Sequence, residues 1–125
     1  MKKLILAAFA AMSLSAGALA QGHQGHADKG SHGGPMQDVV GVHAELLLAE
    51  RTLTVHLYGE DGKPVPSAGY SASALIGTGQ ARQVVQLTPS GENVLTGTAP
   101  NAVARGTSLT LQVKAPGGRT GQARF

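Results

Sequence analysis

The sequence predicts a small all-β domain: an immunoglobulin-like antiparallel β-sandwich of about seven strands, with a small open barrel as the alternative. From Asp38 onward, short runs of alternating apolar and polar residues are separated by Gly, Pro and Asn, which is typical of strands and turns. No apolar repeat of helical period competes with them beyond the first twenty residues. Aromatic residues are scarce, so the core is expected to consist of Val, Leu, Ile and Ala.

The first twenty residues have the composition of a cleaved secretory signal peptide. Lys2 and Lys3 precede an apolar stretch, Leu4–Met12, and the small residues Ala18–Ala20 match the pattern that signal peptidase cuts. The apolar stretch is shorter than the roughly 20 residues that span a bilayer. We therefore expect export to a bacterial periplasm, without membrane insertion.

Composition excludes several classes of protein once residues 1–20 are removed. Lys plus Arg falls from 10 to 10 − 2 = 8 against 7 Asp plus Glu, so the formal charge falls from +3 to +1. Because the basic residues are also scattered along the chain, nucleic-acid binding is not expected. The chain contains no Cys, which excludes disulfides and thiolate metal sites.

The exported chain divides into two parts by composition. Residues 21–37 are rich in Gly, His and Gln and hold too little apolar surface to order themselves, so we expect a disordered, flexible tail. Residues 38–125 contain the strand patterns and form the expected sandwich domain.

The first hairpin of that domain has a predictable register. A pairing of Leu48 with Leu53 places the apolar faces of both strands on one side of the sheet, whereas a slip of one residue would turn one face outward. The same register pairs Leu46 with Val55, Ala44 with Leu57, Leu47 with Thr54, Glu45 with His56 and His43 with Tyr58. His43, Glu45, His56 and Tyr58 are therefore expected to form one patch on the other face. The turn at Glu50-Arg51 lacks Gly and Asn, so a longer loop and a different register stay open.

Three further stretches predict the remaining strands. Ala72, Ala74 and Ile76 alternate within "YSASALIG", and apolar residues flank a turn at residues 89–93. Leu109, Leu111 and Val113 alternate in the last third of the chain, before a turn at residues 116–118 and a final strand with Ala123 and Phe125 on one face.

Several short motifs carry a resemblance. "HGG" at residues 32–34, "HAELLL" from His43, "YGEDGKPVPSAGYSASA" and a terminal "ARF" together resemble small exported bacterial proteins associated with heavy-metal and copper efflux systems. A similar "HGG...E" segment occurs in an N-terminal domain of some efflux adaptor proteins. The likeness spans residues 32–125 and implies a metal-related role with an efflux component as partner. "DGKPVPSAG" is also similar to transthyretin-like and carboxypeptidase-regulatory sandwiches, which implies the fold alone.

The residues themselves suggest a metal site at the mature terminus. Cleavage after Ala20 exposes Gln21-Gly22-His23, in which the amine, two backbone amides and the His23 ring can surround one ion in a plane. Square-planar nitrogen ligation selects Cu(II) or Ni(II). A shifted cleavage, or cyclisation of Gln21, would remove this site.

Other candidate ligands lie further along the chain. His26, Asp28 and His32 offer nitrogen and oxygen donors, and Met36 offers a sulfur suited to Cu(I). The alternative for this tail is a solvated linker without bound metal. For the hairpin patch, His43, Glu45 and His56 are the donors that a divalent ion such as Zn(II) accepts. There we favour a simpler interpretation, a half-exposed polar face on which Glu45 and His56 form an ordinary ion pair.

These patterns favour a function without catalysis. The chain has no GxSxG, phosphate-binding loop, HExxH or paired acidic motif, so an enzyme is not expected. We expect a periplasmic protein, linked to metal resistance or efflux, that binds or delivers a metal ion. Copper is the favoured ion. The alternative is an interaction or structural sandwich whose strand edges recruit another protein and whose histidines are incidental.

Overall fold

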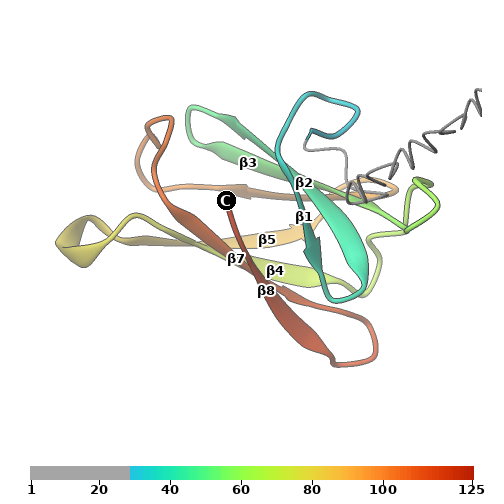
Figure 1. Cartoon of the computed structure of the whole chain (residues 1–125). Coiled ribbons are helices and arrows are strands. Elements are labelled where there is room, and N and C mark those ends of the chain that lie inside the picture. The colour runs from blue at the N-terminus through green and yellow to red at the C-terminus, as the bar shows by residue number, and fades with distance from the viewer. Residues whose placement is uncertain (1–28) are drawn as a thin grey trace, which may run out of the picture.

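The computed structural model describes residues 29–125, which form eight strands and no α-helix (Figure 1). The strands are β1 (Met36–Val39), β2 (Val42–Ala49), β3 (Thr52–Tyr58), β4 (Ser71–Ile76), β5 (Gln83–Pro89), β6 (Val94–Thr98), β7 (Leu109–Lys114) and β8 (Thr120–Arg124). One short 3₁₀ turn, η1 (Gly79–Ala81), precedes β5. Within this part of the chain, no helix has the length and apolar character to cross a membrane.

All pairings are antiparallel, and the strands follow the order β1-β2-β3-β6-β5-β4-β7-β8 (Figure 1). Strand β5 connects the two halves of the sheet. Its residues Gln83–Leu87 pair with β4, and its last two residues, Thr88 and Pro89, pair with β6. The sheet thus bends around a single core, and β5 belongs to both layers.

The sheet comes close to closing on itself. Strands β1 and β8, which end the strand order, contact each other without a ladder of hydrogen bonds. Gly121 permits this approach, because a Cβ atom at that position would lie 2.8 Å from Val40 Cγ2 and 3.1 Å from the Val40 nitrogen. The fold is therefore a nearly closed eight-stranded sheet.

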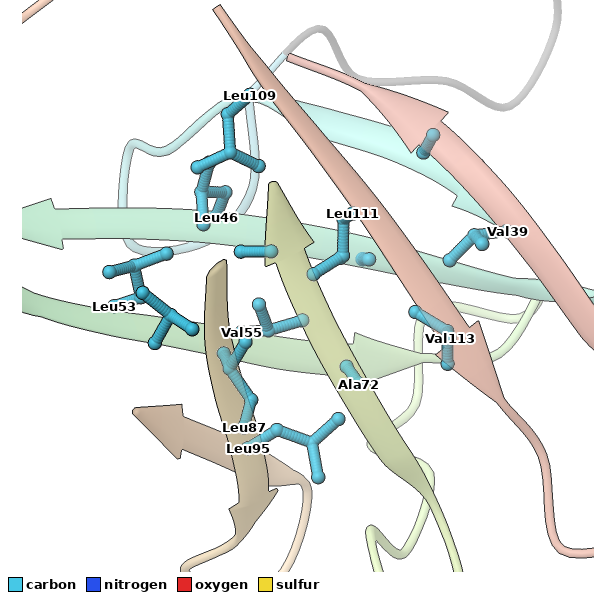
Figure 2. Close-up of a cluster of buried hydrophobic side chains, with 14 of the residues drawn as sticks. Val39, Leu46, Leu53, Val55, Ala72, Leu87, Leu95, Leu109, Leu111 and Val113 are labelled. Atoms are coloured by element: carbon cyan, nitrogen blue, oxygen red, sulfur yellow. The ribbon is translucent and has the colours of Figure 1, made fainter. Parts of the chain in front are cut away.

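The core lies between the two layers and consists of aliphatic side chains (Figure 2). The alternating apolar positions of each strand point inward because successive side chains of a strand face opposite sides. The buried residues are Val39, Val42, Ala44, Leu46, Leu53, Val55, Leu57, Ala72, Ala74, Ile76, Val85, Leu87, Leu95, Ala99, Leu109, Leu111, Val113 and Ala123.

The structure confirms the predicted all-β class and the register of the first hairpin. Leu48 pairs with Leu53, Glu45 with His56 and His43 with Tyr58. The turn is two residues long, with Glu50 at a φ of 55°, so the longer loop that the sequence left open does not occur. The fold has eight strands, where the sequence predicted about seven, and the continuous sheet is close to the open-barrel alternative.

The additional strand, β1, begins within the predicted flexible tail, residues 21–37, and ends in the predicted domain. Residues 36 and 37 belong to β1, and Lys29 and Pro35 form an isolated β-bridge, so residues 29–37 are part of the fold. A two-residue turn, in which Val40 and Gly41 both have positive φ, returns the chain from β1 into β2. The predicted signal peptide, residues 1–20, and residues 21–28 lie outside the described residues.

Candidate functional site

A loop of five residues, Gly30 to Gly34, covers the outer face of β2; we call it the 30–34 loop. The Gly30 N–H donates to the Gly34 carbonyl at 2.7 Å, and the Gly33 N–H donates to the Gly30 carbonyl at 2.9 Å. The Leu46 N–H donates to the Pro35 carbonyl at 3.0 Å and fixes the end of the loop against β2. The loop therefore lies on the same face of the sheet as Glu45.

The Glu45 carboxylate is fully buried beneath this loop. Its Oε2 accepts hydrogen bonds from the main-chain N–H groups of His32 and Gly34, each at 2.9 Å. Its Oε1 lies 2.9 Å from Nδ1 of the His32 ring. Burial opposes ionisation of Glu45, but the hydrogen bonds from the His32 side chain and from the Gly34 and His32 main chain outweigh it and lower the pKa of Glu45.

Two glycines of the loop leave the space that the carboxylate occupies. A Cβ atom at Gly30 would lie 2.2 Å from Glu45 Cδ, closer than atoms can approach. A Cβ atom at Gly34 would lie 2.4 Å from the Leu46 carbonyl oxygen and 3.1 Å from Glu45 Cγ. The second glycine of the "HGG" motif is thus required by close packing on β2.

His32 has a defined tautomer in this arrangement. An ionised carboxylate only accepts hydrogen bonds, so Nδ1 of the ring carries the hydrogen that is donated to Glu45. In the neutral ring, the lone pair then belongs to Nε2. The side chain of His32 is 46% exposed, which leaves the ring accessible to a ligand from solution.

The His32 ring stacks on His56 of β3. The ring centroids are 4.0 Å apart and the planes differ by 18°. Burial lowers the pKa of His56, and repulsion from His32 lowers it further, while attraction to Glu45 partly offsets these effects. The pair therefore consists of two imidazoles stacked face to face, with His56 held toward its neutral form.

Tyr58 and Ser31 complete the surroundings of His32. The two hydroxyl groups lie 2.8 Å apart, and the Tyr58 hydroxyl lies 3.3 Å from His32 Nδ1. Ser31 Oγ lies 3.4 Å from the same nitrogen. Because Glu45 and Ser31 both contact Nδ1, these three side chains do not form a serine–histidine–carboxylate relay, which needs the two ring nitrogens for separate partners.

His43 occupies the next position along the same face of β2. Its Nδ1 makes a short contact with the Asp38 carboxylate of β1. His43 and Met36 line a cavity of about 220 Å³ together with Tyr58. Met36 and His43 thus lie at the edge of the site, beside the His32–His56 pair.

The structure brings together five of the predicted ligands. Met36, His43, Glu45, His56 and His32 all lie on or over the outer face of β1, β2 and β3. Gln21, Gly22, His23, His26 and Asp28 lie outside the described residues. Among residues 29–125, no group of three or more His, Cys, Asp or Glu side chains is arranged to hold a metal ion.

One prediction for this face is wrong. Glu45 and His56 are neighbours in the register, but no ion pair joins them within residues 29–125; the partner of Glu45 is His32. The predicted half-exposed position of Glu45 is also wrong, because the 30–34 loop covers it. Sequence reasoning also missed Gly30, Gly34 and Asp38, although the paired glycines after His32 were a signal of close packing.

Comparison with protein-family models, curated proteins and solved structures gives no match for this chain. The site is therefore interpreted from its own chemistry. Its central elements are two stacked imidazoles, a buried carboxylate that orients one of them, and a glycine-rich loop that keeps water from this carboxylate.

Proposed function

We propose that this is an exported, non-enzymatic protein that binds a metal ion through nitrogen donors, and that copper is the preferred ion. The observation that carries the proposal is the hydrogen bond between His32 Nδ1 and the buried Glu45 carboxylate. Histidines that ligate metals usually donate their second ring nitrogen to a carboxylate or carbonyl, which fixes the tautomer and raises the basicity of the ligating nitrogen. Glu45 supports that role for His32.

The properties of His56 support the same function. A histidine binds metal only in its neutral form, so protons compete with the ion. The lowered pKa of His56 reduces this competition near neutral pH. Stacking keeps the centroid of the His56 ring 4.0 Å from that of the His32 ring.

The donor set favours particular ions. Imidazole nitrogen suits copper, nickel and zinc, and copper binds most tightly of the divalent first-row ions. Two imidazoles do not complete a coordination shell, so a bound ion needs further ligands. His26 precedes Lys29 by three residues, at most about 10 Å of chain, and the amine of Gln21 with Gly22 and His23 forms the planar site proposed above.

The biological role follows from the expected export and from the resemblance. We place the protein in the periplasm, where it binds copper or delivers it to a component of a metal-efflux system. The leader formed by residues 21–28 captures the ion, and the His32–His56 pair holds it against the folded domain.

A copper titration of the mature protein, residues 21–125, tests this function. We expect Cu(II) to bind with visible absorbance, and a double variant, His32→Gln with His56→Gln, to weaken binding about tenfold, in line with the effect of losing ligands or their supports. Gln112→Ala, an exposed position on β7, is the control and should bind as the wild type does. A variant with His23→Gln and His26→Gln measures how much residues 21–28 contribute to copper binding.

Each outcome of the titration has a defined meaning. No uptake by the wild-type protein contradicts the proposed function. Wild-type uptake that survives the double variant and disappears with the leader variant contradicts the part played by His32 and His56. Thermal unfolding of each variant shows whether a loss of binding reflects a loss of structure.

A further inference from the structure

A second cavity lies on the outer face of the sheet over β4, β7 and β8, far in sequence from the His32–His56 pair. It has a volume of about 380 Å³ and lies where the β4–β5 connection meets the beginning of β7 and the end of β8. Arg82 and Arg124 both line it, together with Leu75, Thr110 and Phe125. The proposed metal function uses none of these residues.

The register of the sheet builds one wall of this cavity. Leu75 pairs with Thr110, and Thr110 pairs with Arg124, so the three residues form a row across β4, β7 and β8. Residues paired directly across strands have their side chains on the same face. This row therefore places the Arg124 side chain beside a threonine hydroxyl and an aliphatic surface.

The connection between β4 and β5 brings the second arginine to the cavity. Gly77 and Gly79 have positive φ angles of 79° and 63°, which turn the chain back after β4. The Gly77 N–H donates to the Ser108 carbonyl at 2.8 Å and holds the connection against the segment before β7. Arg82, which follows η1, thereby lines the same cavity as Arg124.

Arg82 and Arg124 give this cavity positive charge. No ion pair within residues 29–125 involves the Arg82 or Arg124 side chain, and no acidic residue lines the cavity. From residue 71 to residue 125 the sequence contains five basic residues and one acidic residue, Glu92. Glu92 follows the far end of β5, and Arg82 precedes its beginning. The length of this strand, calculated from the rise per residue, separates them by about 20 Å.

We propose that this cavity binds a small organic oxyanion, a carboxylate or phosphate group attached to an apolar part. Guanidinium groups donate paired hydrogen bonds that match the geometry of carboxylate and phosphate. The hydroxyl groups of Thr78, Ser108 and Thr110 are further donors, while Leu75 and Phe125 offer apolar contact. The volume is within the range of small-molecule sites.

A titration with matched probes tests the proposal. Benzoate is the carboxylate probe, phenyl phosphate the phosphate probe, and benzamide the uncharged molecule of the same shape as benzoate. Binding is measured from amide chemical shifts of the 77–82 connection and Thr110 in ¹⁵N-labelled protein. We expect one or both anions to bind at least about tenfold more tightly than benzamide, since hydrogen bonds to charged groups are the strong ones.

Variants locate the binding. Arg82→Gln and Arg124→Gln should each weaken binding of the anion about tenfold, whereas Arg119→Gln, in the β7–β8 turn and outside the cavity, should leave it unchanged. The proposal is overturned if neither anion shifts these amides, if benzamide binds as tightly as both anions, or if Arg119→Gln weakens binding as much as the two cavity variants do.

Discussion

Glu45 holds His32 through two hydrogen bonds of 2.9 Å, one to the main-chain N–H and one to the ring Nδ1. The two residues are 13 positions apart, on β2 and on the loop that covers it. This contact fixes the 30–34 loop against β2 and sets the tautomer of the His32 ring, which stacks on His56. Several measurable consequences follow from it.

Replacement of the buried carboxylate should destabilise the domain. In Glu45→Gln, one accepting oxygen becomes a donor that faces the N–H groups now bound to Glu45, and hydrogen bonds to a charged group are lost. We expect a loss of about 2 kcal/mol in the free energy of unfolding at pH 7. Urea denaturation measures it, with Gln112→Ala as the control; an equal midpoint for Glu45→Gln and wild type would contradict the structural role of Glu45.

A methyl group in the loop should displace the carboxylate. Gly30→Ala places a Cβ atom within 2.2 Å of Glu45 Cδ, so the loop or the carboxylate must move. We expect a destabilisation of about 1–3 kcal/mol, the usual cost of overpacking. Gly117→Ala is the matched control, because a Cβ atom there has no neighbour within 4 Å. The interpretation fails if both variants unfold at the same temperature.

Stability should fall in two steps on acidification. The pKa of His56 is lowered from 6.5 in the folded protein, so on acidification the unfolded chain binds a proton before the folded protein does. The contribution of His56 to the free energy of unfolding is therefore complete above pH 6.5 and is lost as the pH falls through the folded-state pKa. The pKa of Glu45 is lowered from 4.5, so its contribution is lost in the same direction below pH 4.5.

Denaturation between pH 8 and pH 3 resolves the two steps. His56→Gln should remove the step below pH 6.5 and keep the lower one, and Glu45→Gln should remove the step below pH 4.5. Gln112→Ala should show both. A wild-type free energy of unfolding that is constant between pH 6.5 and pH 5 would contradict the environment described for His56.

Copper should stabilise the fold only where it binds to the folded domain, and not where it binds to residues 21–23. A site formed by the consecutive residues Gln21, Gly22 and His23 requires no folded structure and binds the unfolded chain as well, so it adds no stability. Binding to the His32–His56 pair requires the fold and adds about 2.7 kcal/mol when free copper exceeds the dissociation constant 100-fold. Thermal unfolding with Cu(II) should show this shift in the wild type and not in the His32→Gln, His56→Gln variant; equal shifts in both would assign the stabilisation elsewhere.

The hairpin of β2 and β3 shows which strand pairings can be predicted from local sequence patterns. Apolar alternation specified that Leu48 faces Leu53 and that Glu45 faces His56, because only one register buries both apolar faces. The same patterns missed β1, whose four residues MQDV contain one buried side chain, Val39. A strand this short is defined by its pairing with β2, and composition alone does not reveal that pairing.

The sequence alone determined the all-β class, the pairing of the main hairpin and the placement of His43, Glu45, His56 and Tyr58 on one face, since these depend on the two-residue period of a strand. Tertiary structure decided that Glu45 is buried and bound to His32 and that Arg82 and Arg124 share a cavity. The first arrangement joins residues 13 positions apart and the second brings together residues 42 positions apart, and both depend on which backbone atoms and charges the nearly closed sheet places side by side. Spacing along the chain does not encode that arrangement directly.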